Sequence, residues 1–146
     1  MYDWWRDAKN SLQVFICKEF FMLTKIALKE FASYLKNVQY KNVLRVIKLE
    51  YCTDDDNNVY IHLNIIKIKK ASQNQGYGSL IMSDIIRFAN KHNVRIELYA
   101  SIIFGSEISR LYKFYERFGF VKVVNDPDHK MIYNNVLIKN NYVVFS

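Results

Sequence analysis

Residues 73–79 read Gln-Asn-Gln-Gly-Tyr-Gly-Ser, and this short stretch holds two of the four glycines in a chain of 146 residues. It follows the apolar run "VYIHLNIIKIKK" (59–70) and precedes "LIMSDIIRFANK" (80–91), where apolar residues recur at helical spacing. A strand that enters a helix through glycines gathers several backbone N–H groups at the positive end of the helix, which suits an anion. Taken alone, the stretch equally fits a tight turn that needs small residues.

The segments around the glycines predict a mixed α/β fold in which helices pack on a sheet. Runs rich in β-branched and aromatic residues indicate strands, and the turn "TDDDNN" (53–58) joins the first two of them. We expect strands over 42–52, 59–70, 94–100 and 120–124, with one or two more over 131–146, and helices over 77–93 and 106–119. Residues 11–37 predict one long helix or two short ones.

The composition indicates a folded domain whose positive charge either attracts anionic partners or simply solvates the surface. The chain is 51% hydrophobic and 24% charged, and its formal net charge is +7. The densest positive cluster is Lys67, Lys69 and Lys70, directly before the glycine stretch. Cys17 and Cys52 lack the spacing of metal ligands, so we expect no metal site and no disulfide framework. With no signal peptide and no membrane span evident in the sequence, we expect a cytoplasmic protein.

Two motifs resemble those of one enzyme family. Residues 73–78 match [Arg/Gln]-x-x-Gly-x-[Gly/Ala], which is similar to the pyrophosphate-binding motif of the GCN5-related N-acetyltransferases (GNAT). "LYKFYERFGF" (111–120) resembles the second signature of that superfamily, a tyrosine-bearing helix followed by Gly-Phe. The resemblance implies one domain over 1–146, with helices over 1–38, an acetyl-CoA-binding core over 59–120 and C-terminal strands over 121–146. Its sheet is mainly antiparallel and flanked by helices, with a β-α-β-α-β-β core.

The sequence departs from the family pattern at three points. Ile68-Lys69-Lys70 stands where the family often has Val-x-Pro, and Gln73 replaces the commoner arginine. Ile108 lies near the position of a frequent asparagine in the tyrosine-bearing helix, which removes an expected polar contact to the cofactor.

The resemblance implies acetyl-CoA as the acetyl donor and no metal. The backbone of Ile66 and Ile68 then holds the pantetheine arm, with an oxyanion donor at or near Ile68. Lys69 and Lys70 either meet the 3′-phosphate or are simply solvated. The remaining expected cofactor contacts are Gln73, Asn74, Gln75, Gly76, Tyr77, Gly78 and Ser79 around the pyrophosphate, together with Tyr112.

The implied reaction is direct attack of an amine on the thioester, without an acyl-enzyme. Tyr115, four residues before Gly119, is the expected proton donor to the leaving thiolate. Tyr112 is an alternative donor, and a reaction with no tyrosine acid also remains open. His62, on the polar side of its strand, is the candidate general base, because histidine titrates near neutral pH. Glu97 on the next strand is the alternative base, and a base acting through water is a third.

The acceptor cannot be read from the sequence. A protein lysine, an N-terminal amine, a polyamine, an aminoacyl-tRNA and a small-molecule amine all remain open. A homodimer formed through the C-terminal strands is a further expectation. The rival interpretations are a catalytically inactive GNAT-fold module that binds acyl-CoA or a protein, and a nucleic-acid-binding module that uses the basic surface.

Overall fold

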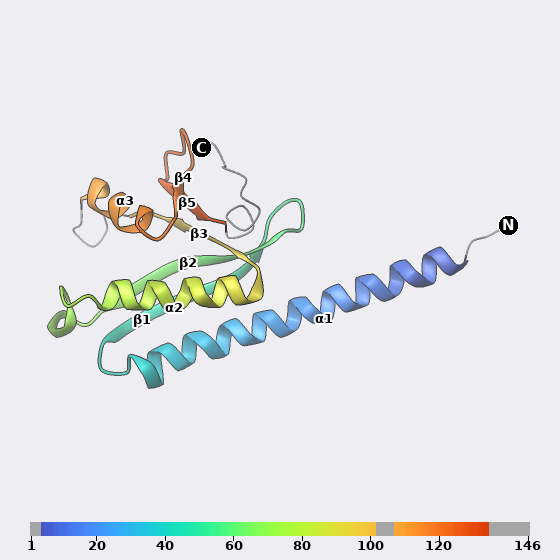
Figure 1. Cartoon of the computed structure of the whole chain (residues 1–146), viewed down its shortest axis with the longest axis horizontal. Helices are drawn as coiled ribbons and strands as arrows, with labels where there is room; N and C mark the ends of the chain where they lie inside the picture. Colours follow the sequence, from blue (N-terminus) through green and yellow to red (C-terminus); the bar gives the residue numbers. More distant parts are fainter. Residues whose placement is uncertain (1–3, 102–106, 135–146) are drawn as a thin grey trace.

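The computed structural model describes residues 4–101 and 107–134, with the side chains of residues 4–10 and 12–17 outside the description. The chain begins with a long helix and continues into a sheet with two further helices (Figure 1). In chain order the elements are α1 (Trp4–Tyr34), the π-helical η1 (Leu35–Gln39), β1 (Leu44–Thr53), β2 (Val59–Ile68), the 3₁₀ turn η2 (Lys70–Ser72), α2 (Tyr77–His92), β3 (Arg95–Tyr99), α3 (Ile108–Glu116), β4 (Val121–Lys122) and β5 (Lys130–Tyr133).

The sheet has the strand order β1-β2-β3-β5-β4. β1 and β2 form an antiparallel hairpin, and β5 pairs antiparallel with both β3 and β4. Among the described strands, the one parallel pair is β2 with β3, which are connected through α2. The prediction of a mainly antiparallel sheet with a β-α-β-α-β-β core is therefore confirmed by the segment from β2 to β5.

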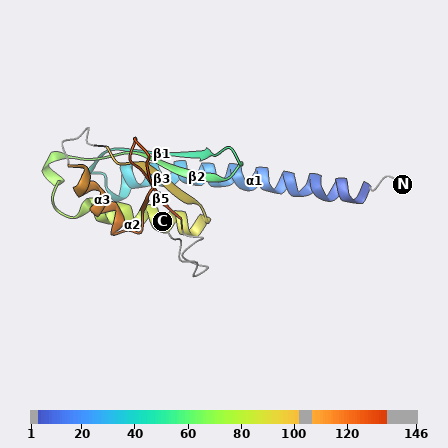
Figure 2. The same cartoon turned by 90° about the horizontal axis from the view of Figure 1, so that it is seen from above.

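One continuous helix accounts for most of the N-terminal segment. Residues 4–34 contain neither glycine nor proline, so nothing in the backbone interrupts the helix. Near its C-terminal end Leu28 is buried in the core, and Phe31 stacks on Phe88 of α2 at a ring distance of 4.6 Å. The N-terminal half extends past the sheet, as Figures 1 and 2 show. Of the two alternatives in the sequence, the single long helix is found.

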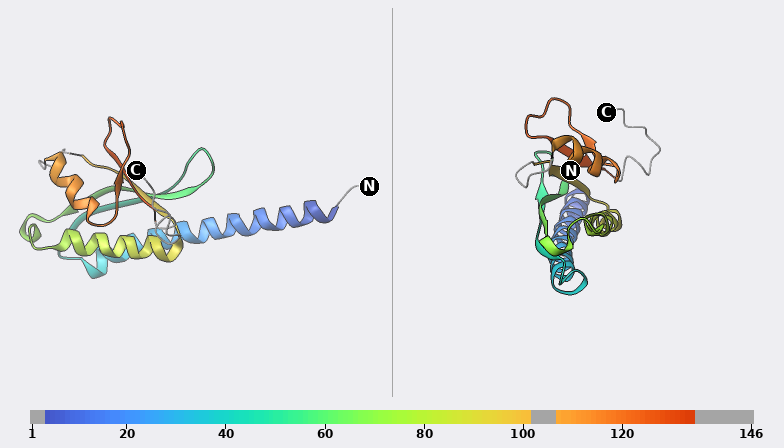
Figure 3. Two further views of the ribbon diagram at one scale, coloured as in Figure 1. Left: turned by 45° about the horizontal axis from the view of Figure 1, so that its top comes forward. Right: turned by 90° about the vertical axis from the view of Figure 1, so that its left-hand side faces the viewer.

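The two faces of the sheet differ in chemistry. On β2 and β3, Ile61, Leu63, Ile96 and Leu98 are buried in the core beneath α1 and α2, which lie side by side on the same face (Figure 3). Because side chains alternate along a strand, the residues between them point to the opposite face. That opposite face carries His62 and Glu97, which occupy matching positions in the β2–β3 register.

The C-terminal third differs in detail from the prediction. α3 covers Ile108–Glu116, shorter than the expected 106–119, and Glu107 stands at its N-cap without a side-chain cap. Ser106, the expected cap, lies outside the described residues. Gly119 has φ +93°, a left-handed conformation that follows the helix end and suits glycine. Residues 135–146, where a second terminal strand was expected, are outside the description, and so is any dimer contact there.

Candidate functional site

The parallel pair β2–β3 stays together over only part of β2. Registered pairs run from Tyr60 with Arg95 to Leu63 with Leu98. β3 then ends at Tyr99, whereas β2 continues to Ile68 while still paired with β1. From Asn64 to Ile68, the edge of β2 that faces away from β1 has no neighbouring strand in the described part of the chain. We call this segment the open half of β2, because an extended ligand has room to pair along this edge in place of a strand.

The open half of β2 leads directly into the glycine loop. After Ile68 the chain makes the short turn η2, and α2 begins at Tyr77. Asn74 and Gly76 both adopt left-handed backbone conformations, with φ of 62° and 84°. The side-chain amide of Gln73 donates to the carbonyl of Ile68 at 3.2 Å, and that of Gln75 donates to the carbonyl of Ala71 at 2.9 Å. These bonds brace the loop against the end of the strand.

The loop presents several unpaired amides. Among the described residues, no hydrogen bond engages the backbone N–H groups of residues 74–79, and the first helical bond runs from Leu80 N–H to the Gly76 carbonyl at 3.3 Å. These amides stand at the N-terminus of the 16-residue α2, where the helix dipole places partial positive charge. The arrangement fits a phosphate group.

The two glycines have different surroundings. A Cβ built on Gly76 would meet no atom within 4 Å, so the space above this residue is open to a ligand. A Cβ on Gly78 would lie 3.7 Å from the Phe114 ring and 3.8 Å from Ile68, which are ordinary contacts. Gly76 is therefore required by its backbone conformation and by the approach of a ligand, whereas Gly78 closes the packing between α2 and α3.

The two lysines before the loop do not behave alike. The ammonium of Lys69 donates to the carbonyl of Lys41 at 3.3 Å, in the connection before β1. Lys70 is exposed in η2, immediately before the glycine loop. Of the two, Lys70 is the more available to an anion beside the loop.

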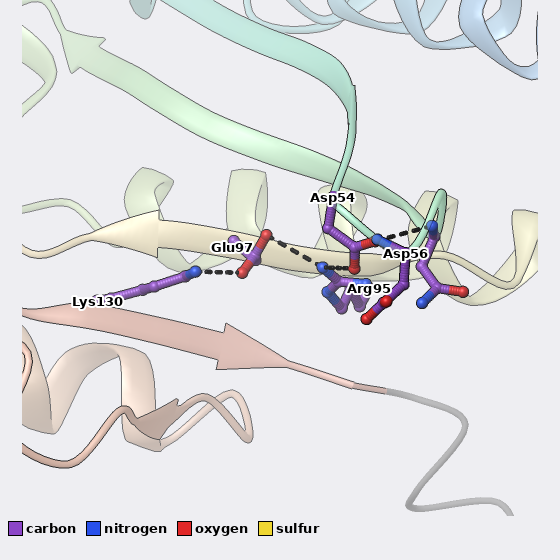
Figure 4. Close-up of polar contacts among 6 residues, drawn as sticks. Asp54, Asp56, Arg95, Glu97 and Lys130 are labelled. Atoms are coloured by element: carbon purple, nitrogen blue, oxygen red, sulfur yellow. Dashed lines mark hydrogen bonds and ion pairs between the residues drawn. The ribbon is translucent and has the colours of Figure 1, made fainter.

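Both sequence-predicted bases lie on the polar face of the sheet, at neighbouring positions. His62 is half-buried and pairs in register with Glu97 on one side and Glu50 on the other. Glu97 is 4% exposed and already carries two ion pairs, with Lys130 at 2.8 Å and Arg95 at 3.4 Å (Figure 4). Since the Glu97 carboxylate is engaged on both oxygens, His62 is the freer of the two to accept a proton.

The ion pairs of Glu97 belong to a larger cluster at the paired half of β2. Arg95 also binds Asp54 at 2.9 Å, and its guanidinium lies 4.8 Å from the centre of the Tyr60 ring. The hydrogen bond that the Lys130 ammonium donates to the Glu97 carboxylate is the main cause that raises the pKa of Lys130. This cluster was missed in the sequence, because its members are brought together only by the register of three strands.

Two tyrosines of α3 have contrasting environments. Tyr115 packs against the rings of Phe114 and Phe120, on the helix-covered side of the sheet. Burial raises its pKa above the ordinary value, so the phenol keeps its proton at neutral pH. The hydroxyl of Tyr112 instead shares a hydrogen bond with Nδ1 of His129, in the turn between β4 and β5. Among the described residues, no polar group forms a hydrogen bond with the Tyr115 hydroxyl, so its proton is available for donation.

A hollow of about 570 Å³ opens where β3 ends. It is lined by Tyr99, Ala100, Ser101, Ile108, Pro127, Asp128 and His129. The Tyr99 ring also contacts the His62 ring, with centroids 5.6 Å apart. Neither Tyr99 nor His129 was singled out in the sequence, where each lies in a segment that predicts only a strand or a turn. The contact through Tyr99 links the hollow to the candidate base.

Other chemistries find little support among the described residues. Cys52 is a free, half-buried thiol whose pKa is raised, chiefly by burial, which disfavours the nucleophilic thiolate. No cluster of three potential metal ligands occurs in residues 4–101 and 107–134. Within the same ranges, no helix combines the length and apolar character that a membrane crossing requires.

Comparison with known families gives one clear match. A family model described as "Acetyltransferase (GNAT) domain" matches residues 23–132. That range contains the glycine loop, both β2 and β3, and the tyrosine-bearing α3. None of the curated proteins matches the sequence significantly.

Solved structures share the fold at low sequence identity. AtaTR bound with AcCoA is 14% identical, with a TM-score of 0.51 over 70% of this chain and 75% of that chain. AtaT complexed with acetyl-methionyl-tRNAfMet is also 14% identical, with a TM-score of 0.51 over 80% and 86%. The KacTA–DNA complex is 18% identical, with a TM-score of 0.48 over 64% of this chain, which spans only 58% of that protein. At these identities the two AtaT structures show a shared fold alone, and the KacTA–DNA complex is a weaker likeness from which nothing further follows.

Proposed function

The chain belongs to the GNAT acetyltransferase family, and on this premise we propose that it transfers an acetyl group from acetyl-CoA to a primary amine by direct attack. The observation that carries the proposal is the continuity of two features. The edge of β2 from residue 64 to 68, which has no neighbouring strand among the described residues, runs into a loop with unpaired amides at a helix N-terminus. Together they offer a backbone ladder for an extended arm and an anion site at its end.

The parts of acetyl-CoA match these two features in the same order, the pantetheine arm with the strand edge and the pyrophosphate with the loop. The open half of β2, with Ile66 and Ile68, binds the amides of the pantetheine arm. The loop from Gln73 to Ser79 binds the pyrophosphate through its backbone N–H groups, and the open space at Gly76 admits the phosphate oxygens. Lys70, rather than the engaged Lys69, is the better partner for the 3′-phosphate.

The acceptor amine approaches from the polar face of the sheet. A primary amine with a pKa near 10.4 is protonated at neutral pH and must lose a proton before it attacks. We assign His62 as the base, directly or through water, because Glu97 is held by Lys130 and Arg95. The hollow at the end of β3 provides room for the acceptor beside Tyr99, which contacts His62.

Proton return takes place on the other face. Tyr115 packs on the helix-covered side, and its raised pKa favours the neutral phenol that a departing thiolate needs. The two roles thus fall on opposite faces of the sheet, with His62 on the polar face and Tyr115 on the helix-covered face. The residue that accepts the proton of the amine therefore need not be the residue that donates a proton to the thiolate.

The proposal is tested by thiol release in the presence of a panel of amines. The panel contains a peptide with lysine, a peptide with a free N-terminus, a polyamine, an aminoacyl-tRNA and a small-molecule amine, each with isotope-labelled acetyl-CoA. We expect stoichiometric thiol release and label transfer with at least one class. Binding of acetyl-CoA without transfer to any class would favour the alternative, a catalytically inactive acyl-CoA-binding or protein-binding module.

A further inference from the structure

The long helix α1 carries a row of exposed side chains that the domain itself does not use. Glu19, Met22, Ile26, Lys29 and Ser33 follow the alternating three- and four-residue spacing of a helix–helix seam, and all five are exposed. Met22 and Ile26 are 53% and 50% exposed, and Leu23 beside them is 65% exposed. We call these five residues the α1 seam.

The α1 seam faces away from the core. Thr24, Leu28 and Leu35, on the other side of the same helical segment, are buried. A shallow hollow of about 630 Å³ continues along the outward face, from Ile26 to Val38. Met22 and Ile26 are exposed one turn apart, with Leu23 beside them. On a helix that projects past its own sheet, these exposed apolar side chains indicate a contact surface.

The charged residues of the α1 seam indicate which partner it binds. We propose that the α1 seam pairs with the α1 seam of a second copy of this chain, with the two helices antiparallel. In one register, Met22 faces Ile26 of the partner subunit and Glu19 faces Lys29 of the partner subunit. A two-fold axis near Thr24 repeats both contacts, so the dimer has two apolar pairs and two ion pairs.

Other arrangements fit the charges less well. In a parallel pair in register, Glu19 would face Glu19 of the partner subunit, and Lys29 would face Lys29 of the partner subunit, both unfavourable. Neither Glu19 nor Lys29 has an ion-pair partner within the described part of its own chain.

The length of the helix permits an adequate contact. In the proposed register, residues 14–34 of the two helices overlap, which is about 30 Å at 1.5 Å per residue. The sheets lie on the outer sides of the helix pair, because each α1 presents its opposite face to its own core. The candidate site at the open half of β2 therefore stays accessible in the dimer.

The experiment uses charge reversal in the full-length chain and sedimentation velocity over a concentration series. Glu19→Lys and Lys29→Glu each place like charges in both contacts, and we expect each to weaken the dimer at least about tenfold. An equimolar mixture of the two variants restores complementary charges in both contacts. The mixture should therefore dimerise about as tightly as the wild type.

The matched control is Asp55→Lys, which makes the same change in net charge as Glu19→Lys at an exposed position in the β1–β2 turn. It should leave the dimer unchanged. The proposal is overturned if the wild type is monomeric throughout, if the single variants dimerise normally, or if mixing fails to restore the dimer. Monomeric wild type that sediments with vesicles of anionic lipid would show that the seam binds a membrane instead.

Discussion

The two halves of strand β2 make an instructive comparison. From Tyr60 to Leu63 the strand is held on both sides, by β1 and by β3, and the side chains facing away from the core meet a cluster of ion pairs. From Asn64 to Ile68, β1 is its only neighbour among the described strands. Pairing on both sides stabilises the first half, and the second half is the one that we propose binds a ligand. One strand serves both purposes because its neighbour β3 is five residues long and β2 is ten.

The largest expected effect is at the loop that ends the open half. Gly76→Val forces a β-branched residue to φ 84° and fills the open space above the amides. We expect acetyl-CoA binding to weaken at least about a hundredfold by calorimetry, which is the loss of about two phosphate contacts. Asn93→Val is the matched control, since Asn93 is also left-handed, with φ 59°, but lies at the other end of α2. Equal loss of binding in both variants would mean that backbone strain, and not the site, is responsible.

We expect the second largest effect from the substitution Tyr115→Phe. It removes the proton donor while retaining the ring, so the acetyl-CoA dissociation constant should stay unchanged and kcat should fall about a hundredfold. Because burial raises the pKa of Tyr115, the wild-type rate should not fall from loss of this proton until pH exceeds the ordinary tyrosine value of 10.0. Tyr112→Phe is the control. If kcat falls in Tyr112→Phe and is retained in Tyr115→Phe, the two assignments must be exchanged.

His62→Gln should have a moderate effect, about tenfold on kcat, because water can replace part of the proton transfer. The defect should be largest with an alkyl amine and small with an aromatic amine, which is already neutral at pH 7. Comparing kcat for these two acceptors checks the role. A defect of the same size with both acceptors contradicts a base role and indicates a structural one.

Glu97→Gln should have the smallest effect on acetyl transfer and a clear effect on folding. The change leaves Lys130 and Arg95 without their shared carboxylate, and we expect unfolding in urea to become easier by about 3 kcal/mol. Because the Glu97 hydrogen bond raises the pKa of Lys130, the stabilisation is present below pH 10.5 and is lost as pH rises through the raised value. A large fall in kcat with unchanged stability would make Glu97 the base instead.

The local features of the site were accessible from the sequence. The glycine loop is readable because its left-handed conformation at position 76 needs a small residue, and its place between a strand and a helix is a local pattern. The order of strands and helices from β2 to β5 followed from periodicity in the same way. The predicted ends of the elements were less accurate, as in α3, where Glu107 stands at the N-cap position and its side chain makes no capping hydrogen bond.

Features that depend on distant parts of the chain could not be predicted. The neighbouring positions of His62 and Glu97 follow from the β2–β3 register, and the engagement of Glu97 follows from Lys130 on a third strand. The Lys69 ammonium donates a hydrogen bond to the carbonyl of Lys41, 28 residues earlier in the chain, although Lys69 lies beside the glycine loop in the sequence. The hollow beside Tyr99 exists only once β3 and the β4–β5 turn are brought together.

The most direct test of the central claim follows backbone amide signals by nuclear magnetic resonance while acetyl-CoA is added to ¹⁵N-labelled protein. If the open half of β2 binds the cofactor, the largest shifts fall on residues 64–68 and 74–79, and residues 60–63, already paired on both sides, shift little. Saturating acetyl-CoA that leaves 64–68 and 74–79 unshifted, or that shifts 60–63 most, would contradict the assignment of the open half of β2 as the cofactor site.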